Sequence, residues 1–472
     1  MTYPPTMPPA PHRAPGQQAA PTAVPAPHAP PPPPPAGVRA VATQRLRAAA
    51  TTEPGRLQII GAVLALLVVA FGVVTAFEIS DRAAAANDVV ERSQPLSADA
   101  AGIYRSLADA DAAAASGFLA GPQEPRPVHE QYVKDIEEAS RLLVKAAANT
   151  DAATESGHEI TTLSEELPHY TGLIERARAN NRQGLPLGGA YLRYANQKMA
   201  NELLPAAERL YTAETDRLDQ DYRSARTWPF FSLAVGVIAL AVLFWAQRRN
   251  YRRTNRVFNH GLLAATAAAT VVLLWLAVGH TVARSDLAES NTHGQQSLDV
   301  LNRARIDSLK ARSNENLTVV ARGAVLTADG KKDKYETDYG TGMKALGAEL
   351  GKAAKLAEDT GDAEGGKPVA DAMAAVTEWQ SRHRTARKTD DSGDYDTALE
   401  QIIGSQNSTG ESFGRVDEAL RKALAHEQSQ FTRAAEDGRG ALGGLPIGAA
   451  ALAVLGAVAA IVGVNRRLSE FR

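Results

Sequence analysis

Residues 57–77 read LQIIGAVLALLVVAFGVVTAF, an apolar stretch without Asp, Glu, Lys or Arg. A stretch of this length can cross about 30 Å of hydrocarbon as a helix. Three further uncharged stretches of this kind follow at residues 229–246, 257–278 and 441–464. The sequence therefore predicts four transmembrane helices. A cleaved signal peptide is the alternative for the first stretch, but its apolar core is longer than that of a signal peptide and a long N-terminal segment precedes it.

Basic residues predict which ends of these helices face the cytoplasm, because cytoplasmic flanks of membrane helices are rich in Lys and Arg. The short loop at residues 247–256 carries Arg248, Arg249, Arg252, Arg253 and Arg256. Residues 1–56 and 465–472 also place arginines beside a span. We therefore expect both termini and this loop in the cytoplasm, and residues 78–228 and 279–440 outside it. The loop is too short to form a nucleic-acid groove, so no nucleic-acid partner is expected.

The order span, long segment, span occurs twice, which predicts a tandem repeat. At one constant offset, Ser106, Leu107 and Gly121 align with Ser308, Leu309 and Gly323, just as the first span aligns with the third. Both long segments are rich in Ala, Glu, Arg and Leu with few alternating apolar runs, a composition typical of helices. The expected fold is an all-α membrane protein with two extracytoplasmic antiparallel four-helix bundles, whose first and last helices continue from the spans.

Apolar residues spaced three and four apart mark the helix faces that pack inside these bundles, as in a coiled coil. Three such seams are Leu192, Ala195, Met199, Leu203, Ala206, Leu210 and Ala213; Phe413, Val416, Leu420 and Ala423; and Ile103, Leu107, Ala110 and Ala114. Gly and Pro residues at 121–127, 184–189 and 361–368 indicate the turns between helices. In the fourth span, Ala449, Ala453 and Ala457 form a face of small residues suited to close helix contact.

The N-terminal tail differs from the rest of the chain in composition, with an unbroken proline run from Pro30 to Pro35. Residues 1–56 are predicted to be disordered and cytoplasmic, since proline-rich chains stay extended and solvated. Such a tail either docks a groove-bearing partner or serves as a plain linker, and the sequence leaves both alternatives open.

Catalytic spacings are missing from the sequence, which predicts that the protein is not an enzyme and binds no metal or cofactor. The chain has no cysteine, which excludes thiol nucleophiles and disulfides. Residues 361–368 resemble a phosphate-binding loop, but Pro368 replaces the Ser or Thr that would hold magnesium. Asp390, Asp394 and Asp396 resemble part of a calcium loop without its glycine and glutamate, and a helix N-cap is the preferred interpretation.

The remaining class of function is binding, and several polar side chains could bind a carboxylate or a partner surface. The candidate ligand- or partner-binding residues are Tyr104, Arg105, Asn180, Asn181, Arg182, Arg312 and Asn314. The alternative for each of them is an ordinary solvated face of a bundle. Asn259 and His260 lie within the third span, close enough to its cytoplasmic end for interfacial solvation to explain them.

Three segments carry a resemblance to a known family. Residues 104–121 (YRSLADADAAAASGFLAG), 170–184 (YTGLIERARANNRQG) and 305–318 (RIDSLKARSNENLT) are similar to the actinobacterial four-pass family called GlnX. The resemblance implies a glutamate- or glutamine-binding lipoprotein as an outside partner and a Ser/Thr protein kinase as an inside partner. It extends from about the first span to the last and does not include the proline-rich tail.

These observations favour a plasma-membrane sensor or adaptor that relays an extracytoplasmic signal, by resemblance amino-acid availability, to a cytoplasmic effector. A structural scaffold of the cell envelope is the alternative from another class. A transporter is less favoured, because the spans lack the charged residues that a substrate path normally needs. Contact with the lipid bilayer is expected, and the sequence leaves a homo-oligomer open.

Overall fold

The computed structural model describes residues 53–254 and 259–468, and within these ranges nearly all regular structure is helical. A single isolated bridge pairs Leu326 with Asp333. The chain divides at Ile59 into two units, and the following description concerns residues 60–472. The all-α prediction is confirmed. Residues 1–52 of the predicted disordered tail, and Arg256, lie outside the described residues. Residues 53–56 belong to the start of the first helix.

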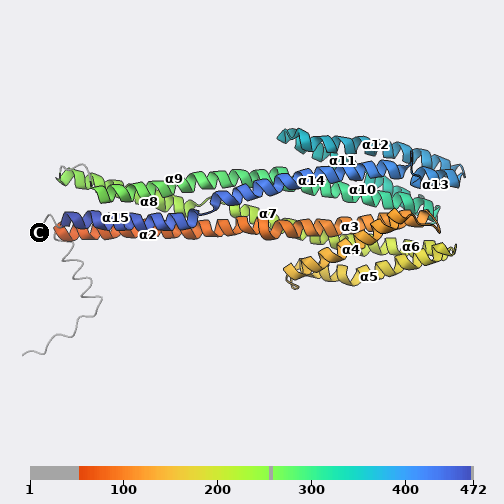
Figure 1. Cartoon of the computed structure of the whole chain (residues 1–472), viewed down its shortest axis with the longest axis horizontal. Helices are drawn as coiled ribbons and strands as arrows, with labels where there is room; N and C mark the ends of the chain where they lie inside the picture. The colour runs from red at the N-terminus through yellow and green to blue at the C-terminus, as the bar shows by residue number, and fades with distance from the viewer. Residues whose placement is uncertain (1–52, 255–258, 469–472) are drawn as a thin grey trace, which may run out of the picture. The chain divides into compact units, whose positions relative to one another are not determined.

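Four helices are long and apolar enough to cross a membrane, and they coincide with the four predicted spans. They are α2 (Glu53–Asp88), α8 (Phe230–Thr254), α9 (His260–Glu289) and α15 (Leu445–Leu468) (Figure 1). All four extend beyond the C-terminal limits predicted for the spans. Helix α2 continues well past Phe77, and α8 runs to Thr254, so most of the predicted loop at 247–256 is helical.

The helices that lead out of the first and third spans are continuous. A π-helical turn, η1 (Val89–Ser93), joins α2 to α3 (Gln94–Leu119). In the same way η3 (Ser290–Gln295) joins α9 to α10 (Gln296–Ala321). The two π-turns match at nearly the offset that aligns Ser106 with Ser308, which supports the tandem repeat. We call α2–η1–α3 and α9–η3–α10 the leading helices.

The helices that return to the membrane are interrupted, which corrects the expectation that the last helix of each bundle continues into its span. Helix α7 (Leu204–Arg226) ends three residues before α8 begins. Helix α14 (Thr409–Leu442) is separated from α15 by Gly443 and Gly444, and Gly444 has φ +74°. Glycine suits this left-handed conformation because it has no Cβ.

The first bundle contains α3, α4 (Arg126–Asn149), α5 (Glu155–Arg182) and a fourth helix made of α6 (Leu187–Lys198), the π-turn η2 (Met199–Leu203) and α7. The predicted seams are its core: Leu192, Ala195, Met199, Leu203, Ala206 and Leu210 are all buried, as are Ile103, Leu107, Ala110 and Ala114. Helix α3 ends at the predicted break, where Gly121 has φ +79°.

The second bundle contains α10, α11 (Lys334–Thr360), α12 (Ala363–Asp391), the short α13 (Tyr395–Ile403) and α14. Its core surrounds Trp379, whose ring meets the rings of Tyr339 and Phe413 edge-on. The N-cap interpretation is confirmed for Asp394, whose carboxylate accepts a hydrogen bond from the amide of Thr397 at 3.2 Å.

The four candidate spans pack closely where small residues meet. A Cβ on Gly72 of α2 would lie 2.1 Å from the Cβ of Ala453 of α15. Ala449, Ala453 and Ala457 are buried, so the predicted small face does form a helix contact. Asn259 is the N-cap of α9: its Oδ1 accepts from the amide of Gly261, and its amide group donates to the carbonyl of Gly463 at 3.0 Å.

The contact between α2 and α15 leads to a first prediction. Gly72→Ala should lower the free energy of unfolding of the purified protein by about 1–3 kcal/mol, because the added methyl group overlaps Ala453. Thermal denaturation in detergent measures this change. Gly172→Ala is a matched control, since a Cβ at Gly172 of α5 would meet nothing within 4 Å. The free energy of unfolding of the control should rise by up to about 1 kcal/mol, because alanine has a higher helix propensity than glycine. Equal stability of the two variants would show that the spans do not pack in this way.

Candidate functional site

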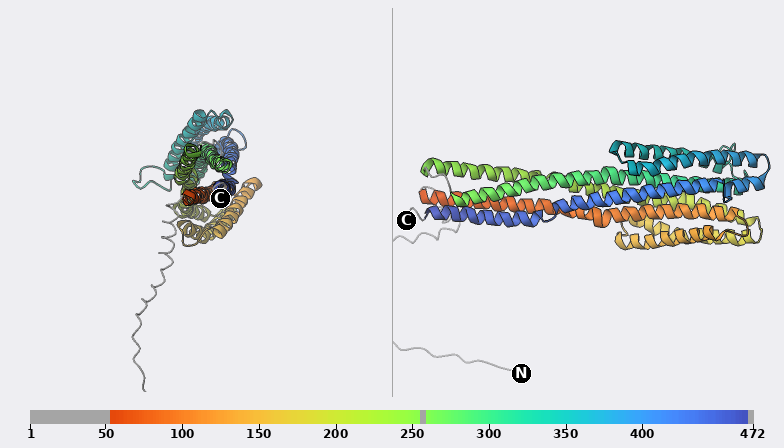
Figure 2. Two further views of the ribbon diagram at one scale, coloured as in Figure 1. Left: turned by 90° about the vertical axis from the view of Figure 1, so that its left-hand side faces the viewer. Right: turned by 45° about the horizontal axis from the view of Figure 1, so that its top comes forward.

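The two bundles meet along their leading helices. Helix α3 packs against α10, and the end-on view in Figure 2 shows an orange-to-yellow bundle beside a teal-to-blue one. Both helices run outward from their spans, so they are parallel. Many of the groups that meet between them are buried and polar, and this α3–α10 interface is the candidate functional site.

Asp111 of α3 lies at the centre of the interface and is 5% exposed. Its carboxylate accepts hydrogen bonds from Ser313 of α10 at 2.5 Å, Asn196 of α6 at 2.8 Å and Tyr170 of α5 at 3.3 Å. Burial raises the pKa of Asp111, and these three donors partly offset that effect. One carboxyl therefore ties together helices from both bundles.

Further polar contacts cross the interface on either side of Asp111. The side-chain amide of Asn316 donates to the hydroxyl of Ser116 at 2.7 Å. Lys310 donates to the hydroxyl of Tyr104 at 2.7 Å, and burial raises the pKa of that hydroxyl. Arg105 donates to Asn302. Of the predicted site residues, Tyr104 and Arg105 thus lie at the boundary between the bundles rather than on a solvated face.

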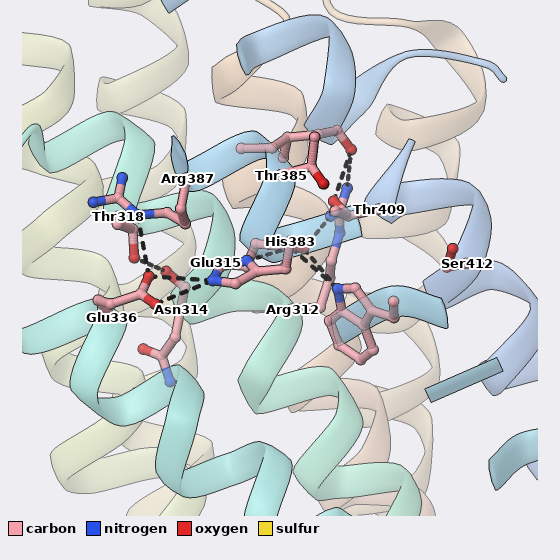
Figure 3. A network of polar contacts seen from close by, with 12 residues as sticks. Arg312, Asn314, Glu315, Thr318, Glu336, His383, Thr385, Arg387, Thr409 and Ser412 are labelled. Carbon is pink, nitrogen blue, oxygen red and sulfur yellow. Dashed lines mark hydrogen bonds and ion pairs between the residues drawn. The ribbon is translucent and has the colours of Figure 1, made fainter. Parts of the chain in front are cut away.

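Arg312 is buried in a different cluster, inside the second bundle (Figure 3). Its guanidinium donates to Glu315 at 2.5 Å, to the hydroxyl of Thr409 at 3.0 Å and to the carbonyl of Ile402 at 3.2 Å. These contacts use the donors that the sequence prediction assigned to a ligand. Asn314 lies beside this cluster on α10 and is half-buried.

Glu315 is the centre of this cluster and is fully buried. It accepts hydrogen bonds from Trp379 at 3.1 Å and from His383 at 2.8 Å in addition to the one from Arg312. Burial works to raise its pKa, but the partners outweigh burial and the pKa is lowered. The carboxylate is therefore charged and shared between two cations.

His383 bridges Glu315 and Glu336 through its two ring nitrogens, with Nε2 3.2 Å from Glu336. Its ring stacks on Tyr339 with centroids 3.8 Å apart. Burial works to lower the pKa of His383, yet the two carboxylates raise it to about 9. A protonated histidine held between two glutamates is a rigid ionic clamp that joins α10, α11 and α12.

The other predicted binding residues lie at the tip of the first bundle. The side chain of Asn181 donates to the carbonyl of Phe118 at 2.9 Å and so caps the end of α3. The amide of Asn180 donates to the carbonyl of Arg176 at 2.8 Å. Arg182 is exposed and lines a small hollow of about 260 Å³ with Asn181. The capping role explains Asn181 without a ligand, and a binding role for the three residues stays a prediction.

The basic segment after the second span forms the end of α8. Arg248 and Arg252 are exposed, and the guanidinium of Arg249 lies 5.4 Å from the ring centroid of Trp245. The side chain of Arg253 and all of Arg256 lie outside the described residues. The described part has the exposed arginines that a headgroup layer requires.

Sequence reasoning missed Asp111, Glu315 and His383. Each stands on a helix whose neighbouring residues are Ala, Ser, Asn or charged, so no local pattern marks it as buried. Asp111 and Glu315 do fall inside the segments that carry the family resemblance. For Asp111, a signal that could have found it is the repeat offset, which pairs it with Ser313, its hydrogen-bond partner.

The fold and this interface define a helical membrane protein in which two bundles extend from candidate spans and meet through buried polar groups. The family model of the actinobacterial sensor domain matches residues 85–223, which include the first bundle up to the last turn of α7. No curated protein matches the chain. No solved structure matches it. The match supports a sensing role for the first bundle.

The ionic clamp around His383 makes stability depend on pH. Its pKa of about 9 lies above the ordinary 6.5, so its contribution is fully present below pH 6.5 and is lost as the pH rises through 9. His383→Gln should therefore destabilise the protein at pH 6 by about 3 kcal/mol and much less at pH 9.5, as measured by thermal denaturation. His158→Gln, at an exposed position, should follow the wild-type profile. A parallel loss at both pH values would contradict the charged clamp.

Proposed function

We propose that the protein is a membrane sensor or adaptor that relays a change in the packing of its two bundles through the leading helices to the cytoplasmic side. The observation that carries the proposal is the unbroken run from each of two candidate spans into the α3–α10 interface. A helix transmits axial shifts along its length, whereas a break absorbs them. The match to the actinobacterial sensor domain supports the same function.

The contacts at the junction between the first bundle and its spans support the role of α2 as the helix that transmits a shift. Where α7 ends, Arg82 of α2 donates to the carbonyls of Thr227 at 2.6 Å and Trp228 at 3.0 Å. Glu78 of α2 accepts from the amide of Ser232 at 2.8 Å. The interrupted helix is thereby held to the leading helix, so a shift of α2 would move the start of α8 with it.

The proposal places both bundles outside the cytoplasm and both termini inside, as the arginine distribution favours. Because the chain has no cysteine, single introduced thiols can report this directly. Asp151→Cys, between α4 and α5, and Asp391→Cys, at the exposed end of α12, should react with a membrane-impermeant maleimide on intact cells. Arg252→Cys should react only after the cells are opened. Labelling of Arg252→Cys alone on intact cells would reverse the orientation and remove the extracytoplasmic signal from the proposal.

The partners belong to the proposal as well. By the resemblance described above, a substrate-binding lipoprotein for glutamate or glutamine contacts the bundles, and a cytoplasmic Ser/Thr protein kinase responds. In this proposal a separate cytoplasmic effector reads the change. A non-sensing scaffold of the cell envelope is the competing function, and the two differ in whether the bundles communicate with the inner ends of the spans.

Communication can be tested without knowing the signal. A Cβ on Gly61 of α2 would lie 3.0 Å from a methyl group of Val464 of α15, so G61C with V464C provides a disulfide reporter. Adding Asn316→Leu, which breaks the buried contact to Ser116, should change the oxidation rate of the reporter several-fold in a relay.

Leu350→Ala is the matched control, because Leu350 is buried in the second bundle on α11, away from α3. It should destabilise the bundle by about 2–5 kcal/mol and leave the reporter rate unchanged. Identical reporter rates in all three backgrounds would favour the scaffold.

A further inference from the structure

A cavity of about 360 Å³ lies between the two bundles on the membrane side of Asp111. It is lined by residues of α3, α7, α10 and α14, so both bundles contribute to its wall. Its size is at the lower end of the range of about 300–1,000 Å³ for small-molecule sites. A ligand there would touch both halves of the repeat at once.

The charged side chains that line the cavity are all positive. Arg105, Arg305 and Arg421 line the cavity, and among the described residues no Asp or Glu does. Neutral hydrogen-bonding groups come from Asn302, Gln94, Gln295 and Gln428, and apolar walls from Leu298 and Phe431. Such a lining suits an anion that has further polar groups.

Of the three arginines that line the cavity, Arg105 is the one without an ion-pair partner among the described residues. Arg305 is bound to Asp417 at 2.6 Å, and Arg421 reaches Asp417 at 3.2 Å. Arg105 has no carboxylate within ion-pair distance in the described part of the chain, and its guanidinium donates a hydrogen bond to Asn302. Burial, followed by the nearby Arg305, lowers the pKa of Arg105 to about 10, which shows that its charge is poorly compensated.

We infer that this cavity binds a small organic carboxylate, with Arg105 as the main anchor and Asn302 and Gln428 as further donors. A carboxylate fits because the planar guanidinium offers two parallel N–H donors to its two oxygens. Binding would neutralise the buried charge and join α3 to α10 and α14. The inference rests on the proposed sensing role, since it names the chemical class of one signal.

The experiment measures binding to the full-length protein in detergent micelles. Acetate, succinate and citrate are titrated by thermal shift and calorimetry, with neutral succinamide as the uncharged analogue and inorganic phosphate as a second oxyanion. At least one carboxylate should bind and raise the melting temperature, and succinamide should not. Absence of any carboxylate binding up to about 10 mM, where the affinity free energy is already small, overturns the inference. Binding of phosphate alone overturns the assigned class.

Variants then place the anion in the cavity. Arg105→Gln should weaken carboxylate binding by about tenfold or more, because a charge-assisted pair is lost. Arg209→Gln is the matched control: Arg209 is on α7 but faces outward and pairs with Glu159 at 2.7 Å, and its loss should leave affinity unchanged.

Gln428→Glu provides a second variant that does not depend on removing an arginine. It adds a carboxylate to the cavity wall and should also weaken anion binding by about tenfold. Unchanged affinity in both Arg105→Gln and Gln428→Glu would overturn the site. The disulfide reporter between α2 and α15 needs no ligand, so a failed binding assay and a failed relay remain distinguishable.

Discussion

The burial of the Asp111 carboxyl between α3 and α10 is the constraint on which the arrangement of the two bundles depends. A carboxyl removed from water without a cation costs several kcal/mol unless hydrogen bonds replace its solvation. Here the donors come from three other helices, so α5, α6 and α10 must all stand in register with α3. Moving one bundle against the other by one residue would break the hydrogen bond from Ser313, whereas the donors of α5 and α6 would stay with α3. The interface therefore combines polar matching with apolar contacts, because Ile306 and Leu309 of α10 share a core cluster with the apolar residues of α3.

The tandem repeat makes this matching feasible. The offset that aligns the two halves pairs Asp111 with Ser313, and these two residues meet across the interface. In a symmetric dimer of one bundle, a residue on the axis would meet its own copy, and two buried carboxylates would repel each other. Joining the halves in one chain lets the equivalent positions differ, so that a donor faces an acceptor. The same freedom allows an uncompensated Arg105 on one side, because its repeat position, Asp307, need not carry the same charge.

Elements with strong periodicity could be predicted from sequence, and those set by tertiary contacts could not. The spans, the apolar seams and the breaks at Gly121 follow from local composition and are present in the structure. The packing of bundle against bundle was not predicted, because α3 is alanine-rich on several faces and the side chains outside its predicted seam do not mark a second contact face. Arg312 could be identified as unusual, but His383, which shares the Glu315 carboxylate with it, lies far along the chain and only the fold brings the three together. Asn181 is a cap for a helix that ends far from it in sequence, which local propensity cannot show.

The same interface suits the transmission of a small shift. Helix α3 buries Ala100, Ala101, Ala108 and Ala110, small side chains that resist sliding less than interlocked large ones. Polar pairs such as Asn316 with Ser116 favour discrete registers over a continuum, because an intermediate position satisfies neither partner. The proposed switch would need two packings that differ by a few kcal/mol, and small apolar side chains combined with discrete polar registers suit that condition. The π-turns η1 and η3 lie between this interface and the candidate spans on both leading helices. Since a π-turn holds one extra residue without breaking the helix, it can adjust register while still carrying motion along the axis. The interrupted α7–α8 and α14–α15 connections lack that property, so the relay that we propose would run through α2 and α9.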